Sequence, residues 1–271
     1  MFYFVFLSFS SAVRLVMRSR LFIFYFLFLA LVLFAAALVA PFSGRQADLV
    51  ALDVGISVMR LVLPLFLVLL VQDLVSKEFE RRYYLTSFSY CCPRYAVLVG
   101  RFLVSFVLAF LLLLTMAFAL AILVYCFGQN SLQVSSVNLG LPYLVVVGGV
   151  GLDLLVLSSL AVFLAVVAST PSFVLIGTFG FMLVSRSYSA VIELLGSSYA
   201  VVGDAETYRA GVGVLGYLMP DLGSLDVRMV ALYGRMEFLP ADWSWLVVSS
   251  LSYAIAFLAL AVWALNRKRF A

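Results

Sequence analysis

The sequence predicts an all-α integral membrane protein with six transmembrane helices, an N-terminal interfacial helix, and short helices in an external segment before the last span. Composition is the first reason, because 66% of the residues are hydrophobic and only 11% are charged, against about 25% charged in soluble domains. The second is the length of the apolar runs, which reach the roughly 20 residues that a helix needs to cross a bilayer. The third is that Lys and Arg gather in a few connecting segments.

The six predicted spans belong to one transmembrane domain covering residues 1–271, and lie at about 21–40, 54–75, 97–127, 141–168, 172–192 and 245–265. The first is an uncharged run that stops at Pro41. Arg60 falls in the second, Asp153 is the single charge of the fourth, and Arg186 falls in the fifth.

Residues 1–20 begin apolar and end basic. Arg14 and Arg18 are four positions apart, so a helix presents them on one face. This pattern favours an interfacial helix with its aromatic residues among acyl chains and its arginines among headgroups. The alternative is an extension of the first span.

The distribution of Lys and Arg predicts the topology. With six spans, eleven of these residues lie on the side of the termini, four lie on the other side, and Arg60 and Arg186 lie within spans. The positive-inside rule then places both termini and the segment 76–96 in the cytoplasm, as expected for the bacterial inner membrane. The external segment 193–244 carries seven acidic residues and three arginines, and is either a lid of short helices that lie at or dip into the outer face or an ordinary loop packed on the bundle.

Charges inside the predicted spans are the candidate functional residues of the bundle. A carboxylate such as Asp153 is costly at that depth unless it is paired or hydrated. We favour a structural acid that is either neutral or paired with Arg60 or Arg186, and a substrate or proton site is the alternative. The nearby Gly148, Gly149 and Gly151 indicate close helix packing.

Several functions are excluded by residues that the sequence lacks. It contains no histidine, which excludes an HExxH zinc site, and no G-x-x-x-x-G-K-[ST] motif, which excludes ATP binding through a P-loop. We expect no cofactor or metal on this chain. The net charge of +4 reflects membrane topology and does not predict a nucleic-acid partner.

The polar segment "SKEFERRYYLTSFSYCCPR" at 76–94 is longer than a turn between two spans requires. Glu78, "FSY" at 88–90, Arg94 and Gly100-Arg101 resemble the connection between spans two and three in permease subunits of ABC transporters of the type-2 (ABC-2) export class. Three further stretches are similar to that family, namely "SSLAVFLAVVASTPSFVLIGT" at 158–178, "YLMPDLGSLDVR" at 217–228 and "YAIAFLALAVWALNRKRF" at 253–270. The sequence departs from the family at Arg82-Tyr83, where Gly-Thr is usual, and in the position of Pro93.

The resemblance implies a permease subunit that forms a homodimer, or a heterodimer with a similar permease, and exports a substrate. ATP and Mg would be bound by a separate ABC ATPase subunit, so this chain would not itself be an enzyme. The implied ATPase-coupling residues are Glu78, Glu80, Arg81, Arg82 and Arg94, and Asp153 and Arg60 are candidates for the pathway. The acidic external segment suits a periplasmic partner. The alternative function is a membrane-embedded lipid-modifying enzyme or a membrane scaffold without transport activity.

Overall fold

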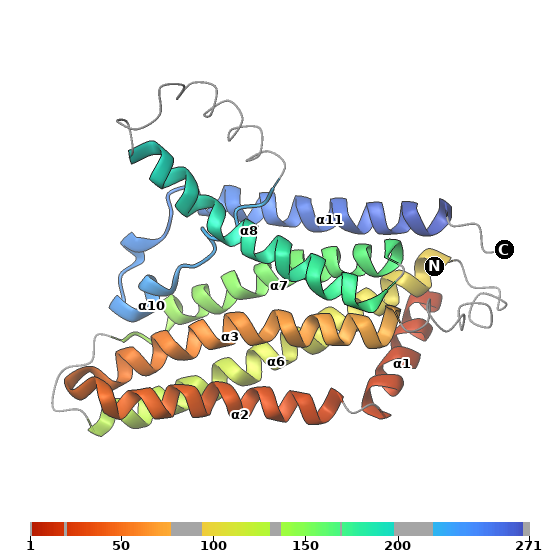
Figure 1. Ribbon diagram of the computed structural model, residues 1–271. Coiled ribbons are helices and arrows are strands. Elements are labelled where there is room, and N and C mark those ends of the chain that lie inside the picture. The colour runs from red at the N-terminus through yellow and green to blue at the C-terminus, as the bar shows by residue number, and fades with distance from the viewer. Residues whose placement is uncertain are drawn as a thin grey trace.

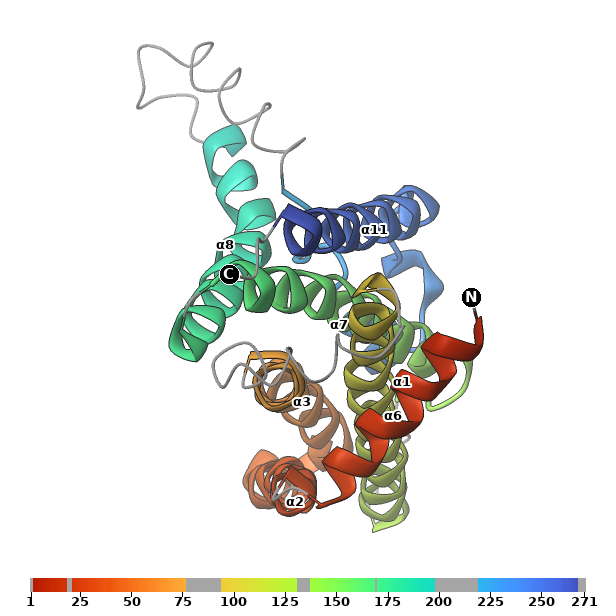
Figure 2. The same cartoon turned by 90° about the vertical axis from the view of Figure 1, so that its right-hand side faces the viewer.

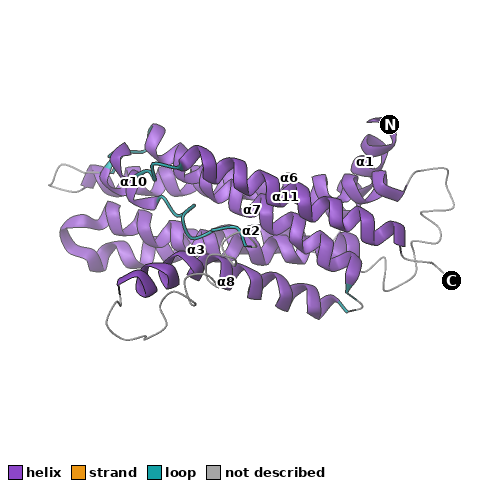
Figure 3. Ribbon diagram, turned by 90° about the horizontal axis from the view of Figure 1, so that it is seen from above, coloured by secondary structure: helices purple, strands orange, loops and turns teal. Residues whose placement is uncertain are grey.

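The computed structural model describes residues 2–18, 21–76, 94–130, 137–168, 170–197 and 219–267, and every regular element within these ranges is helical (Figure 3). The elements are α1 (Phe2–Arg18), α2 (Leu21–Val39), η1 (Ala40–Gln46), α3 (Ala47–Val71), η2 (Gln72–Ser76), α6 (Arg94–Asn130), α7 (Leu141–Val167), α8 (Pro171–Ser197), α10 (Arg228–Tyr233), η3 (Met236–Phe238) and α11 (Trp243–Arg267). The prediction of an all-α protein is therefore confirmed.

Five helical stretches in the described residues are long and apolar enough to cross a membrane. They are Leu21–Phe42, Ala47–Ser76, Tyr95–Gly128, Leu141–Val167 and Trp243–Arg267. These helices indicate a multi-pass membrane protein, as the sequence predicts. The second begins earlier than expected, because Asp48 and Asp53 are accommodated within the helix, where Asp48 is buried.

The helix expected at 172–192 is present as α8 but is not among these five stretches. Its apolar run is diluted by Gly177, Thr178, Ser185, Arg186 and Ser187. In Figure 1, α8 is inclined to its neighbours, which run side by side. A sixth crossing therefore stays a prediction.

Proline and glycine residues mark several helix ends. Pro142 and Pro171 stand at the starts of α7 and α8, where the missing N–H costs no hydrogen bond within the helix. Gly234 follows the end of α10 with a φ of 65°, the left-handed conformation that glycine adopts readily after a helix.

The central helix of the bundle is α7. Viewed along the bundle, α7 lies between α6, α8 and α11 (Figure 2), and it also contacts α3. Of the most apolar window of α7, 72% is buried, against 17% for α2 and for α11. The outer helices expose large apolar side chains such as Phe34, Trp245 and Ile255, which suits contact with lipid.

Helix α1 and the end of α11 lie at the same end of the bundle (Figure 1). Helix α1 crosses that end and packs on the start of α6. Ser8 Oγ donates to the carbonyl oxygen of Val97 at 3.3 Å, and a Cβ at Gly100 would stand only 2.7 Å from Ser8 Oγ. Gly100 therefore allows the close approach of α1, and Ala12 and Val16 are buried there while Phe6 stays exposed.

Candidate functional site

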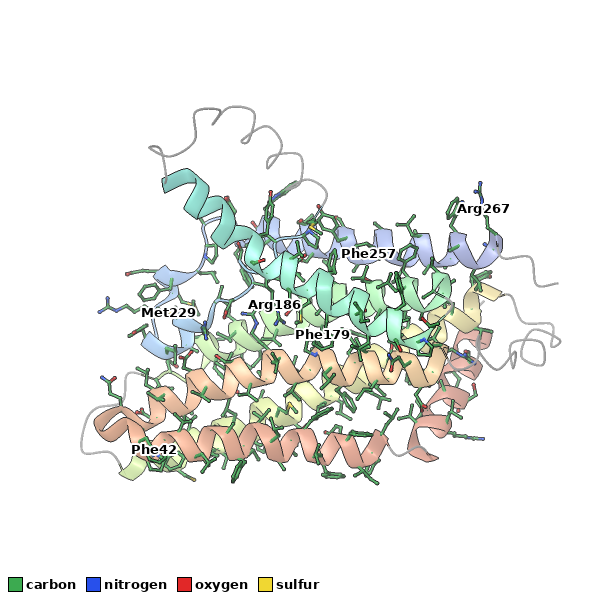
Figure 4. All side chains as sticks on the ribbon, viewed as in Figure 1. Phe42, Phe179, Arg186, Met229, Phe257 and Arg267 are labelled. Atoms are coloured by element: carbon green, nitrogen blue, oxygen red, sulfur yellow. The ribbon has the colours of Figure 1, made fainter. Side chains whose placement is uncertain are left out.

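Charged side chains from three helices meet inside the bundle. Arg186 of α8 reaches α7, where its Nη2 donates to Asp153 Oδ2 at 2.5 Å. The same Nη2 donates to the backbone carbonyl oxygen of Arg60 in α3 at 3.1 Å. Figure 4 shows Arg186 in the interior, between α8 and α3. Of the two partners considered for Asp153, Arg186 makes the direct contact, and Arg60 shares the same donor through its backbone.

The carbonyl oxygen of Arg60 is available because of Pro64. In an α-helix the N–H four residues later binds each carbonyl, and Pro64 has no N–H to donate. A free carbonyl in a membrane helix needs another donor. Arg186 supplies it, so the proline of α3 creates the acceptor that ties α8 to α3.

The side chain of Arg60 extends to a non-helical stretch, residues 219–227, which we call the inserted segment. Arg60 Nη1 forms an ion pair with Asp226, and Nη2 donates to the carbonyl oxygen of Leu222 at 3.3 Å. Leu222 is fully buried, as Leu225 nearly is. Part of the segment 193–244 is therefore buried in the bundle.

Gly149 of α7 makes room for this segment. A Cβ at Gly149 would stand 2.8 Å from the carbonyl oxygen of Leu225, closer than real Cβ atoms approach an oxygen. Gly148, beside it, has nothing within 4 Å of an added Cβ. The glycine run of α7 therefore serves close packing, as predicted, but Gly149 packs against the inserted segment and Gly151 against Phe110 of α6.

Arg228, the first residue of α10, connects the interior charges to the N-terminal half of α3. Its Nη1 donates to Asp53 Oδ1 at 3.0 Å and to Ser57 Oγ at 2.8 Å, and its Nε lies 3.5 Å from Asp226 Oδ2. The side chains of Asp53 and Arg228 are 43% and 37% exposed, whereas that of Asp153 is 2% exposed. The contacts thus run from a half-exposed end to a fully buried one.

We call these six residues the charge network. Its members are Asp53, Arg60, Asp153, Arg186, Asp226 and Arg228. Three carboxylates balance three guanidinium groups, which lowers the cost of holding charge at this depth. Four of its buried atoms nevertheless have no hydrogen-bond partner in the described part of the chain, namely Arg60 Nε, Arg186 Nε, Asp153 Oδ1 and Asp226 Oδ1.

The structure brings together the three intramembrane residues selected from the sequence, Arg60, Asp153 and Arg186. Sequence reasoning missed Asp53, Asp226 and Arg228 as members of the network. One signal was present, because Asp53, Ser57 and Arg60 follow the i, i+4, i+7 spacing of a single helix face. Asp226 and Arg228 carry no such local signal.

The candidate ATPase-coupling residues are only partly covered. Arg94 begins α6, while Glu78, Glu80, Arg81 and Arg82 lie outside the described residues. The helical end that precedes them is well anchored. Arg101 Nη1 donates to the carbonyl oxygen of Leu74 at 2.8 Å, and Gln72 Nε2 donates to that of Pro171 at 2.9 Å. These bonds tie η2, which continues α3, to α6 and to the start of α8.

The described ranges contain no group of three or more His, Cys, Asp or Glu residues that could hold a metal ion. The charge network holds fixed charges in a medium of low polarity. In such a medium, a small displacement of one charge strongly changes its electrostatic interaction energy with the others. A scan against protein-family models finds no match for the chain, and a search of curated proteins finds none either.

The role given to Pro64 predicts an energetic coupling between Pro64 and Arg186. In Pro64→Ala, the new N–H competes with Arg186 for the carbonyl oxygen of Arg60. Arg186→Leu should then cost less free energy of unfolding in the Pro64→Ala background than in the parent, by about 0.5–1.5 kcal/mol, the net worth of one hydrogen bond. A double-mutant cycle in bicelles measures this coupling. Pro64→Ala combined with Ser8→Ala, at the bond from Ser8 of α1 to the carbonyl oxygen of Val97 in α6, is the control and should show additivity.

Proposed function

We propose that the chain is the permease subunit of an ATP-driven ABC transporter of the type-2 export class, placed in the bacterial inner membrane with both termini in the cytoplasm. In this proposal α8 is the fifth of six spans and α1 is the interfacial helix. The ATP and Mg belong to a separate ATPase subunit, and a second permease copy completes the pathway. The family resemblance of the sequence supports the assignment.

The charge network is the observation that carries the proposal. Ionisable residues within a membrane bundle are expensive, and they mark pathways or moving parts more often than inert structure. Here they connect α3, α7, α8 and the inserted segment through ion pairs and a hydrogen bond to Arg60. Such contacts exist in discrete arrangements, so they suit a protein that alternates between two states.

The cytoplasmic end of α3 offers a route between an ATPase and this network. Movement of the segment 76–96 would act on η2, which continues α3 and which the bonds of Gln72 and Arg101 couple to α8 and α6. Along α3, the carbonyl of Arg60 is held by Arg186 of α8. Helices α3 and α8 are therefore bonded to each other at two depths. We expect the two helices to shift together as one rigid body.

Glu78→Ala and Arg94→Ala should separate the permease from its ATPase. Removing one partner of a buried charge pair at a protein interface costs about 2–5 kcal/mol, whereas a solvated charge costs about 0–1 kcal/mol. The tagged parent chain, purified from membranes in mild detergent, should bring down a protein with a P-loop, and each variant should bring down much less of it. Alternatively, the complex should assemble and hydrolyse ATP without transport.

Arg235→Ala and Glu237→Ala are the matched controls, because both side chains are exposed in the external segment. They should co-purify the ATPase like the parent. A cysteine at Met236, which is exposed, labelled from outside by an impermeant thiol reagent, checks the topology of each variant. If the parent chain is recovered from native membranes with no P-loop protein, the proposal is wrong and the lipid-enzyme or scaffold function takes its place.

A further inference from the structure

The pairing of Arg60 with Asp226 is chemically incomplete. A single oxygen, Asp226 Oδ2, serves both Arg60 Nη1 and Arg228 Nε. The second oxygen, Oδ1, and the Nε of Arg60 are buried without a hydrogen-bond partner in the described part of the chain. A guanidinium group presents its N–H donors in a fork that suits two oxygens at once. Asp226 therefore binds only some of the N–H donors of Arg60.

The origin of Asp226 also differs from that of the other interior charges. Arg60, Asp153 and Arg186 lie on long helices, whereas Asp226 lies on the non-helical inserted segment. The side chain of Asp226 is 25% exposed, and that of Arg60 only 8%. The anionic partner of Arg60 is thus the member of the pair that can leave without disturbing a helix of the bundle.

Withdrawal of Asp226 changes the charge balance of the site. Three arginines would then face two carboxylates, Asp53 and Asp153, and Asp153 is already bound to Arg186. The Arg60 guanidinium would be left in the interior with its Nε and Nη1 free, and an unpaired buried charge of this kind is strongly unfavourable. Another anion in the same place would restore the balance.

From these contacts we infer that Asp226 occupies a binding site for a phosphate group, and that the inserted segment is a displaceable plug over it. A phosphate monoester or free phosphate presents at least three terminal oxygens, enough to engage the fork of Arg60 and the Nε of Arg228 together. Arginine binds phosphate in this bidentate manner. The partial exposure of Arg228 and Asp53 marks the side from which the ligand enters.

The inference goes beyond the proposed function, because phosphate binding at Arg60 needs no ATPase subunit. It can be tested on the full chain purified alone in phosphatidylcholine nanodiscs. Failure of binding would therefore leave the co-purification result untouched, and the reverse also holds.

Asp226→Asn should open the site while preserving the shape of the side chain. Inorganic phosphate, or phosphatidic acid in the nanodisc as the lipid-borne source, should bind about tenfold or more tightly to this variant than to the parent, because a plug that occupies the site lowers apparent affinity by the fraction of open molecules. Tryptophan fluorescence reports binding through Trp243, whose ring lies near Gly149 and the inserted segment. A gain with phosphatidic acid alone identifies a headgroup as the source, and a gain with inorganic phosphate identifies a soluble one.

Arg60→Gln, added to Asp226→Asn, should abolish the gain. The inference is overturned if Asp226→Asn gains affinity for neither source, or if the gain persists without Arg60. A second measurement does not depend on either variant. Leu222→Cys, fully buried beside Arg60, should react with a hydrophilic thiol reagent faster when phosphate or phosphatidic acid is present. Leu154→Cys, equally buried in α7, should not. An unchanged reaction rate at Leu222→Cys with both sources also overturns the inference.

Discussion

Asp153→Leu should lower the free energy of unfolding by about 3–5 kcal/mol, the usual loss when one member of a buried ion pair is removed. Among the described residues, the variant leaves Arg186 with only the carbonyl oxygen of Arg60 as a partner in the interior. Arg186→Leu should be destabilising for the same reason, since it leaves the carboxylate of Asp153 without its only described hydrogen-bond partner.

The double variant Asp153→Leu/Arg186→Leu should regain most of the lost stability. Replacing both members of a buried pair with apolar residues is often neutral, because the desolvation cost of the charges disappears with their attraction. Unfolding by denaturant titration in bicelles measures all three variants. If the double variant is as unstable as the single ones, the pair is not the source of the loss.

Asp53→Ala is the matched control at the outer end of the same network. Its side chain and that of Arg228 are 43% and 37% exposed, so this pair should contribute only about 0–1 kcal/mol.

Transport by the stable double variant then separates the two roles left open for Asp153. Retained transport indicates a structural pair, and lost transport with normal assembly indicates a substrate or proton site.

Gly149→Ala and Gly148→Ala should have opposite effects on stability. Alanine is favoured over glycine in a helix by about 0.5–1 kcal/mol, and Gly148 has open space for the extra methyl group. At Gly149 the methyl group would meet the backbone carbonyl of Leu225 at 2.8 Å. The inserted segment must then move, and overpacking of this kind costs about 1–3 kcal/mol.

The same experiment in bicelles measures the two alanine variants, and the reactivity of Leu222→Cys reports the position of the inserted segment. Only Gly149→Ala should raise that reactivity, because the displaced segment exposes residue 222. Equal stabilities and equal reactivities for the two variants would show that the segment does not pack on Gly149.

The sequence was sufficient for the long helices because their signal is local. An uncharged run such as 21–40 has only one stable form in lipid, a helix with all its backbone bonds made internally. The start of α3 was harder to predict, because Asp48 and Asp53 interrupt the apolar pattern of that run. Asp53 is tolerated because Arg228 binds it, and no local pattern reveals a partner 175 positions away.

Three of the six residues of the charge network could be selected from the sequence, for the same reason. The selected residues are charges within apolar predicted spans, namely Arg60, Asp153 and Arg186. Their position in the spans was sufficient to identify them as candidates. Asp226 and Arg228 lie in a polar stretch where charges are ordinary, and the sequence interpretation used them only to balance the external segment. Their role depends on the inserted segment entering the bundle beside Gly149, which is a property of the tertiary structure.

The spacing of the network along the chain has a consequence for biosynthesis. Ribosomes extend a chain by about 5–20 residues per second. Asp153 and Arg186 are 33 positions apart, so at about 5–20 residues per second they are both available within roughly 2–7 s. Arg60 and Leu222 are 162 positions apart, which takes roughly 8–30 s at the same speed. The nascent chain must therefore carry the Arg60 cation through insertion before its final partners exist, while the contact between α7 and α8 can form during translation.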